Sequence, residues 1–126
     1  MSARVVHFEV PFDDADRARR FYSDVFDWQI QHVPEVDYTM VTTGPVSDQG
    51  MPTEPGYIGG GMMQRQADVA TPVITLQVDD IDATLISIEK NGGARVGEKL
   101  TVADMGFAAY FKDSEGNLMG LWQTAS

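Results

Sequence analysis

The sequence contains no cysteine, and its apolar segments are short. Without cysteine the chain cannot form disulfides, Cys-ligated zinc or iron–sulfur centres, or a thiol nucleophile. No apolar segment approaches the roughly 18 residues that span a bilayer, and the first residues, Met1 to Arg4, lack the apolar run of a signal peptide. These absences predict a cytoplasmic protein without thiol chemistry or a membrane span.

Positive charge is also scarce. The 126 residues include 9 Lys and Arg against 19 Asp and Glu, which gives a formal net charge of -10 at pH 7. Such a surface repels nucleic acid phosphates and anionic membranes, and no local basic patch offsets it, so we expect neither as a partner. The sequence leaves open whether the acidic surface reflects a high-salt habitat.

The first half of the chain predicts a strand, a helix and three further strands. Apolar residues alternate over residues 5–10, as in a half-buried strand. Asp13 or Asp14 is available as N-cap for a helix whose apolar stripe comprises Ala18, Phe21, Tyr22, Val25 and Phe26. The further strands are expected at residues 28–33, 38–43 and 58–64, with a turn at 34–37 and an exposed loop at 44–56.

The second half predicts the same order of elements. A strand is expected at residues 73–78, and Asp79 and Asp80 precede a helix that ends at Asn91-Gly92-Gly93, a usual left-handed stop. Three strands follow at residues 95–100, 106–112 and 118–123, with a hairpin turn at 113–117 between the last two.

The amino-acid sequence itself also contains an internal repeat. The segment His7-Phe8-Glu9-Val10 precedes Thr75-Leu76-Gln77-Val78 by 68 residues, and the two aspartate clusters that open the helices are 66 residues apart. A duplication at half the chain length indicates a fold that is built from two similar halves. We predict an α+β fold of two βαβββ repeats, repeat 1 at residues 1–66 and repeat 2 at residues 71–126, in a single pseudo-symmetric domain over residues 1–126.

These features resemble the vicinal oxygen chelate superfamily, which groups glyoxalase I, bleomycin-resistance proteins and extradiol dioxygenases, and within it a glyoxalase-related bacterial subgroup. Four segments carry the resemblance: residues 6–10, residues 17–28, residues 78–83 and residues 113–122. The resemblance implies that curved mixed sheets from the two halves form one cleft. It also implies that metal-dependent members hold a divalent cation there with His, Gln or Glu side chains.

The residues at the matching ligand positions are Val5, Gly60 or Gly61, Val73 and Gly120. Valine and glycine side chains offer no donor atom, so we predict no cofactor at the family's usual metal site. A strand slip of two residues would bring His7 onto the first ligand position, because residues i and i+2 share a face. A divalent metal is therefore expected only through a non-standard site.

Alternation along the first strand places His7 and Glu9 on one face, directed into the expected cleft. His7 and Glu9 are the candidate catalytic residues, because imidazole beside a carboxylate can act as a base near neutral pH. A purely structural His7–Glu9 pair is the alternative. The candidate ligand-binding residues are Thr75, Gln77, Tyr110, Trp122 and Met62.

Other residues favour plainer interpretations. A surface role is expected for His32, and a core position competes with a ligand contact for Met62 and Phe107. Gly59-Gly60-Gly61 lacks the features of a phosphate loop, so a bulge or a close backbone approach is expected there. The arginines of the first helix are expected to be solvated or paired with nearby aspartates.

The leading hypothesis is a protein that binds a small organic ligand in the cleft, without the family's usual metal, with any catalysis being proton transfer by His7 and Glu9. One alternative is a metal-dependent lyase, isomerase or dioxygenase with a relocated site at His7, Glu9 and Gln77. Another is a non-enzymatic protein that sequesters a drug or metabolite, and a third is a scaffold whose cleft is filled by its own side chains. Homodimerisation is compatible with two halves in one chain but is not required by them.

Overall fold

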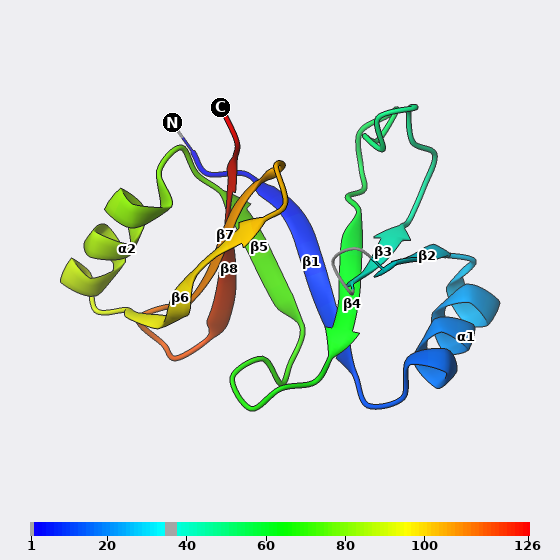
Figure 1. Cartoon of the computed structure of the whole chain (residues 1–126), viewed down its shortest axis with the longest axis horizontal. Helices are drawn as coiled ribbons and strands as arrows, with labels where there is room; N and C mark the ends of the chain where they lie inside the picture. The colour runs from blue at the N-terminus through cyan, green and yellow to red at the C-terminus, as the bar shows by residue number, and fades with distance from the viewer. Residues whose placement is uncertain (1, 35–37) are drawn as a thin grey trace. The chain divides into compact units, whose positions relative to one another are not determined.

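The computed structural model describes residues 2–34 and 38–126 and divides into two compact units. One unit comprises His7–Pro72, and the other comprises Met1–Val6 together with Val73–Ser126. They are called here the His7–Pro72 unit and the Val73–Ser126 unit. Figure 1 shows that each unit combines one helix with several strands. Among the described residues no helix is long and apolar enough to cross a membrane.

The sheet of the His7–Pro72 unit has the strand order β2-β3-β4-β1, with β1 parallel to β4 and the other neighbours antiparallel. Its elements, in chain order, are β1 (Val5–Phe12), α1 (Ala15–Phe26), β2 (Gln29–Val33), β3 (Tyr38–Thr42) and β4 (Gly60–Gln64). The turn predicted at residues 34–37 falls mostly on residues 35–37, which lie outside the described residues.

The sheet of the Val73–Ser126 unit has the order β5-β8-β7-β6, with β5 parallel to β8 and the rest antiparallel. Its elements are β5 (Val73–Gln77), α2 (Ile81–Lys90), β6 (Ala94–Val102), β7 (Gly106–Lys112) and β8 (Leu118–Thr124). Both units therefore have the same connectivity and the same mixed sheet. The predicted α+β class with two βαβββ units is confirmed, whereas the single shared cleft and the single domain stay predictions.

Both helices begin with an aspartate as N-cap. The Asp14 carboxylate accepts a hydrogen bond from the Arg17 amide at 3.0 Å, and Asp80 accepts one from Ala83 at 3.1 Å. Such N-caps satisfy amides that have no partner inside the helix. The expected stop after α2 is confirmed, since Gly92 has φ +94°. The first helix ends differently, because Asp27 adopts the left-handed conformation with φ 58°.

Helix α2 covers one face of its sheet and contacts β6, β7 and β8. The buried cluster beneath α2 contains Ile81 and Leu85 from α2, and Ala109, Phe111 and Leu121 from the sheet. Because neighbouring residues on a strand point to opposite faces, the positions between these core residues face away from α2.

Helix α1 is covered much less. None of its residues is buried, and the side chains of Phe21, Val25 and Phe26 remain 54%, 58% and 55% exposed. The closest aromatic contact of α1 with its own unit is made by Tyr22, whose ring stacks on Trp28 with 4.8 Å between centroids. Trp28 in turn lies 5.5 Å from the Phe8 ring of β1. The predicted apolar stripe is present, but only its Tyr22 side is packed.

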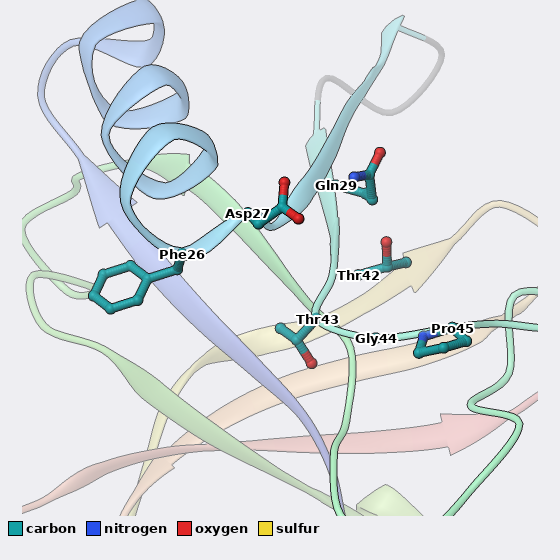
Figure 2. Close-up of a pocket in the computed structure, with 7 residues that line it drawn as sticks. All are labelled: Phe26, Asp27, Gln29, Thr42, Thr43, Gly44 and Pro45. Atoms are coloured by element: carbon teal, nitrogen blue, oxygen red, sulfur yellow. The ribbon is translucent and has the colours of Figure 1, made fainter.

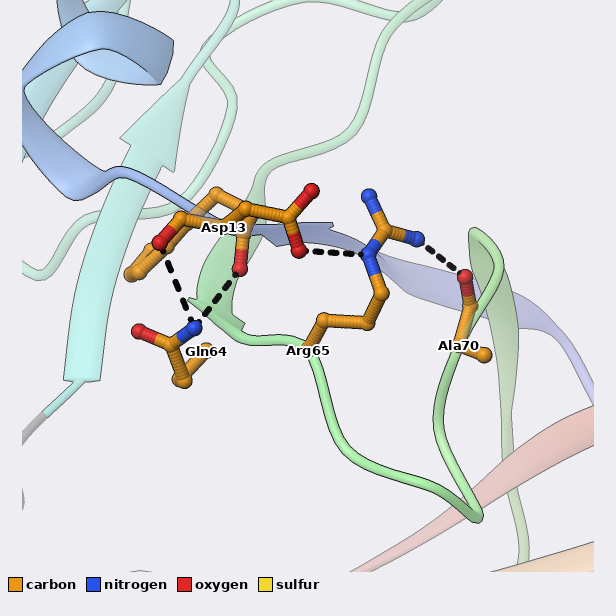
Figure 3. Close-up of polar contacts among 5 residues, drawn as sticks. Asp13, Gln64, Arg65 and Ala70 are labelled. Atoms are coloured by element: carbon orange, nitrogen blue, oxygen red, sulfur yellow. Dashed lines mark hydrogen bonds and ion pairs between the residues drawn. The ribbon is translucent and has the colours of Figure 1, made fainter.

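The parallel pair of β1 and β4 is tied together where both strands end (Figure 3). The Arg65 amide donates to the Phe12 carbonyl at 2.8 Å, and its guanidinium donates to the Asp13 carboxylate at 2.9 Å and also to the Ala70 carbonyl. Gln64 Nε2 donates to the Phe12 and Asp13 carbonyls at 3.3 and 3.4 Å. These bonds accompany the extension of β1 to Phe12, two residues beyond the predicted end.

Candidate functional site

His7 and Glu9 lie on the face of β1 that is directed away from α1. Glu9 is paired with Gly61 of β4, and Gly61 is paired with Met40 of β3. Tyr38 precedes Met40 by two residues, so it shares this face. The opposite face of β3 is directed toward α1, because the buried Thr39 hydroxyl accepts a hydrogen bond from Arg19 of α1 at 3.1 Å. The sheet thus places His7, Glu9 and Tyr38 together.

A hydrogen-bonded chain links these three side chains. The Tyr38 hydroxyl donates to Glu9 Oε2 at 2.7 Å, a short distance typical of a bond to a charged acceptor. His7 Nε2 lies 3.0 Å from the same hydroxyl oxygen. The two rings are nearly parallel, with an interplanar angle of 25°. His7 and Glu9 are therefore connected through Tyr38.

Gly61 provides the room for the Tyr38 ring. A methyl group added to Gly61 would come within 1.9 Å of the Tyr38 hydroxyl oxygen, which no folded structure tolerates. At the neighbouring Gly60 an added methyl group would meet the Phe8 ring and the Phe8 carbonyl at 2.6 Å. The close approach expected at this run of glycines is confirmed.

The environment of His7 keeps its imidazole neutral. Burial lowers the pKa of His7 below its usual value, because a charged ring would lose hydration, while the nearby Glu9 carboxylate partly opposes this shift. A neutral imidazole has one nitrogen that carries a proton and one with a free lone pair. His7 therefore has the protonation state that a proton acceptor needs near neutral pH.

A second group of polar side chains in this unit lies on the α1 side. Arg19 forms an ion pair with Asp16 at 3.9 Å, as expected for this helix, and its guanidinium also lies 3.5 Å from Nδ1 of the exposed His32. These contacts connect α1 to β2 and β3. They are separated from His7 by the sheet itself, so the surface role expected for His32 fits its position.

The ligand-binding candidates of the Val73–Ser126 unit share one face of its sheet. Thr75 is paired with Gly120 and Gln77 with Trp122, while Gly120 is paired with Tyr110, so all four candidate side chains point the same way. This face is directed away from the α2 core. Trp122 Nε1 and Gln77 Nε2 both donate to the Thr124 hydroxyl, at 3.1 and 3.4 Å.

Met62 lies apart from these candidates. It is paired with Val10 and Thr39, which places it on the α1 side of the sheet of the His7–Pro72 unit, opposite to the face of His7. Its side chain is fully buried. This position fits the core alternative for Met62. Phe107 is half-buried and packs against the core beneath α2.

The positions that match the family's metal ligands do not fit a metal ion. Valine and glycine provide no side-chain donor, and the space beside two of these glycines is already filled. Tyr38 occupies the space at Gly61, and the Thr75 hydroxyl would lie 2.7 Å from a methyl group added to Gly120. A longer ligand side chain at either position would collide with these groups. Within residues 2–34 and 38–126, no group of three or more His, Cys, Asp and Glu side chains is placed to hold a metal ion.

A surface pocket of about 370 Å³ opens elsewhere in the His7–Pro72 unit (Figure 2). It lies where α1 ends and where β3 leads into the following loop, and its lining residues are Phe26, Asp27, Gln29, Thr42, Thr43, Gly44 and Pro45. None of the predicted site residues lines this pocket. The pocket is therefore separate from His7 and Glu9.

Tyr38 is the member of the site that sequence reasoning missed. The expected strand at residues 38–43 placed Tyr38 at its beginning, but nothing in the letters indicated which partner strand it would face. The signal that points to Tyr38 is the run of three glycines, Gly59 to Gly61. A position without a side chain next to Glu9 leaves room for a large ring from the adjacent strand.

Comparisons with known proteins agree with the fold and the resemblance. Residues 4–44 match the family model described as the N-terminal region of bleomycin resistance protein-like proteins. A glyoxylase-like domain-containing protein of Didymella fabae is 28% identical over 122 residues, which cover 93% of this chain and 91% of that protein.

Solved structures with the same fold include three from bacteria. A hypothetical protein from Bacillus halodurans has a TM-score of 0.64 at 12% identity, covering 100% of this chain and 97% of that one. Methylmalonyl-CoA epimerase from Mycobacterium tuberculosis has a TM-score of 0.59 at 16% identity, with 97% and 88% covered. A glyoxalase/bleomycin resistance protein/dioxygenase superfamily member from Vibrio splendidus has a TM-score of 0.59 at 15% identity, with 98% and 99% covered.

The repeated βαβββ connectivity, the match of residues 4–44 and the relative that is similar over nearly its whole length all agree in what the chain resembles. In fold and in sequence the chain is similar to proteins of the glyoxalase/bleomycin resistance protein/dioxygenase superfamily, also called the vicinal oxygen chelate superfamily.

Proposed function

We propose that the chain binds a small organic molecule at the face of β1 that carries His7 and Glu9, and that it moves a proton on that molecule without the metal of the family's usual site. The hydrogen-bonded chain from His7 through Tyr38 to Glu9 is the observation that supports this proposal. Thr75, Gln77, Tyr110 and Trp122 are proposed to contact the ligand.

The proposed chemistry follows from the state of His7. The neutral imidazole takes a proton from the ligand, and the electron pair of the broken bond stays on the ligand. The ring then carries a positive charge, and the Glu9 carboxylate stabilises this charge through the Tyr38 hydroxyl. After the ring proton has exchanged with water, a proton returns from the ring to the ligand, so the chain needs no oxidant, reductant or second substrate for this step.

The epimerases with a similar fold suggest a first probe for this chemistry. Methylmalonyl-CoA is the compound that those proteins are named for. We propose to screen it with other small organic acids and thioesters for ligands that raise the melting temperature of the chain. Ligands that bind are then incubated with the protein in deuterium oxide, and deuterium on the recovered ligand is measured by mass spectrometry.

The proposal predicts deuterium incorporation with the wild type and at least a hundredfold slower incorporation with His7→Ala, in line with the roughly 10²–10⁴-fold contribution of general acid–base catalysis. His32→Ala is the matched control, because His32 is exposed on the other side of the sheet and should leave the rate unchanged. A ligand that binds at His7 without any exchange would instead support the sequestering protein. A stoichiometric divalent ion that is lost with His7→Ala would support the relocated metal site.

A further inference from the structure

The single hydroxyl proton of Tyr38 determines which nitrogen of His7 carries a proton. An ionised carboxylate only accepts hydrogen bonds, so the hydroxyl proton goes to Glu9. The Tyr38 oxygen can therefore only accept from His7. This direction requires the His7 proton to be on Nε2, which lies 3.0 Å from the Tyr38 oxygen.

The other nitrogen of the ring is left with its lone pair. Among residues 2–34 and 38–126 no hydrogen bond to His7 Nδ1 is formed, and this atom is not among the buried polar atoms that lack a partner. Nδ1 is thus an acceptor that solvent or a ligand can reach. The two nitrogens of His7 have separate roles, one toward Tyr38 and one toward the open side.

The position of Tyr38 depends on Gly61. The ring of Tyr38 lies directly over Gly61, and any side chain at Gly61 would displace it. The same strand pairing places Glu9 beside Gly61. The absence of a side chain at this position is therefore what allows a tyrosine to stand between the imidazole and the carboxylate.

From this geometry we infer that Tyr38 is a positioning residue: it holds the His7 proton on Nε2 and leaves Nδ1 as the atom that accepts the proton of the ligand. The inference rests on the proposed function only in taking His7 as the base. The positions of the proton and of the reactive nitrogen are properties of the free protein, so they can be measured without a ligand.

Proton–nitrogen NMR spectra of the His7 ring test the first part. The chain has only two histidines, and His32 serves as an internal reference. We expect a directly bonded proton signal at Nε2 of His7 that exchanges slowly with water, because it is held by Tyr38. Tyr38→Phe should lose this signal, and Gly61→Ala should lose it too. Tyr57→Phe is the control, because its hydroxyl donates to the Pro45 carbonyl at 2.6 Å and has no contact with His7.

Alkylation with iodoacetamide near neutral pH tests the second part, since no cysteine competes for the reagent. Hydrolysis and amino acid analysis distinguish histidine alkylated at Nδ1 from histidine alkylated at Nε2. We expect modification of His7 at Nδ1 in the wild type and at both nitrogens in Tyr38→Phe. A ring proton on Nδ1, a slowly exchanging signal that survives Tyr38→Phe, or alkylation of wild-type His7 at Nε2 would overturn the inference. Alkylation of His32 without alkylation of His7 would also overturn the inference.

The two proposals fail separately. If no ligand shows proton exchange but the NMR and alkylation results are as expected, the proposed function is wrong and the role of Tyr38 in positioning the ring stands. If exchange depends on His7 but not on Tyr38, the proposed function stands and the positioning role is wrong.

Discussion

At the scale of single residues, the site depends on how three side chains from two strands meet. Alternation along residues 5–10 is enough to place His7 and Glu9 on one face, and this part was predictable. Tyr38 was not, because it lies 29 residues from Glu9 in the sequence. Its contact depends on the order β3-β4-β1 and on a register in which Gly61 stands beside Glu9. This strand order and register cannot be predicted directly from a single sequence.

The lowered pKa of His7 predicts how stability depends on pH. The unfolded chain takes up the proton of this histidine near the ordinary value of about 6.5, whereas the folded chain takes it up only at lower pH. The contribution of neutral His7 to the free energy of unfolding is therefore fully present above about pH 6.5. It is lost as the pH falls from there toward the pKa of His7 in the folded chain. Urea denaturation of the wild type and of His7→Gln, from pH 8 downward, measures this effect.

The difference in unfolding free energy between wild type and His7→Gln should shrink as the pH falls. His32→Gln provides the control, because His32 is exposed. A constant difference between wild type and His7→Gln over the whole range would contradict the burial of a neutral imidazole at this position.

Gly61→Ala tests the close approach of Tyr38. The added methyl group would collide with the Tyr38 hydroxyl, and overpacking of this kind costs about 1–3 kcal/mol of unfolding free energy. The cost should be much smaller when Tyr38→Ala is already present, because the colliding ring is gone. A double-mutant cycle by urea denaturation measures this coupling, and equal costs in both backgrounds would show that the ring does not lie over Gly61.

At the scale of elements, the sequence predicted the two helices and most strand positions. Helical spacing and the capping aspartates located α1 and α2, because both signals act over a few residues. The ends of strands were less predictable: β1 continues through Pro11 to Phe12, since bonds from Arg65 and Gln64 reach its last residues from the end of β4. The sequence also did not predict how well each helix is packed, because both helices have an apolar stripe, and residues of this stripe are buried in α2 but not in α1.

The buried face of α2 should carry much of the stability of its unit. Leu85 is 1% exposed and packs within the core, so Leu85→Ala is expected to lower the unfolding free energy by about 2–5 kcal/mol. Leu100 is a matched control in the same unit, with 51% of its surface exposed. Leu100→Ala should change stability by no more than about 0.5 kcal/mol. Similar costs for the two leucines in urea denaturation would refute this account of the core.

At the scale of the whole molecule, the acidic excess is a property of the surface. The observed ion pairs, Arg19–Asp16, Arg65–Asp13 and Lys99–Asp82, each join a basic residue to one of the 19 acidic residues, and all three are partly exposed. Exposed ion pairs of this kind contribute little to the free energy of unfolding. Repulsion among the remaining carboxylates therefore opposes folding. The homodimer and the cytoplasmic location stay predictions.

Salt should consequently stabilise the protein. Sodium chloride screens the repulsion between exposed carboxylates. We expect the melting temperature at pH 7 to rise steadily from low to high sodium chloride concentration in differential scanning calorimetry. A melting temperature that falls with added salt would mean that attractive ion pairs outweigh the repulsion.

The central claim is that ligands bind at the face of β1 around His7. A crystal structure of the protein with a ligand from the thermal screen tests it most directly. We expect a polar or acidic atom of the ligand at hydrogen-bond distance, about 2.6–3.2 Å, from His7 Nδ1, with the His7–Tyr38–Glu9 chain intact. A ligand in the pocket between Phe26 and Pro45, with the His7 face left to solvent, would contradict it.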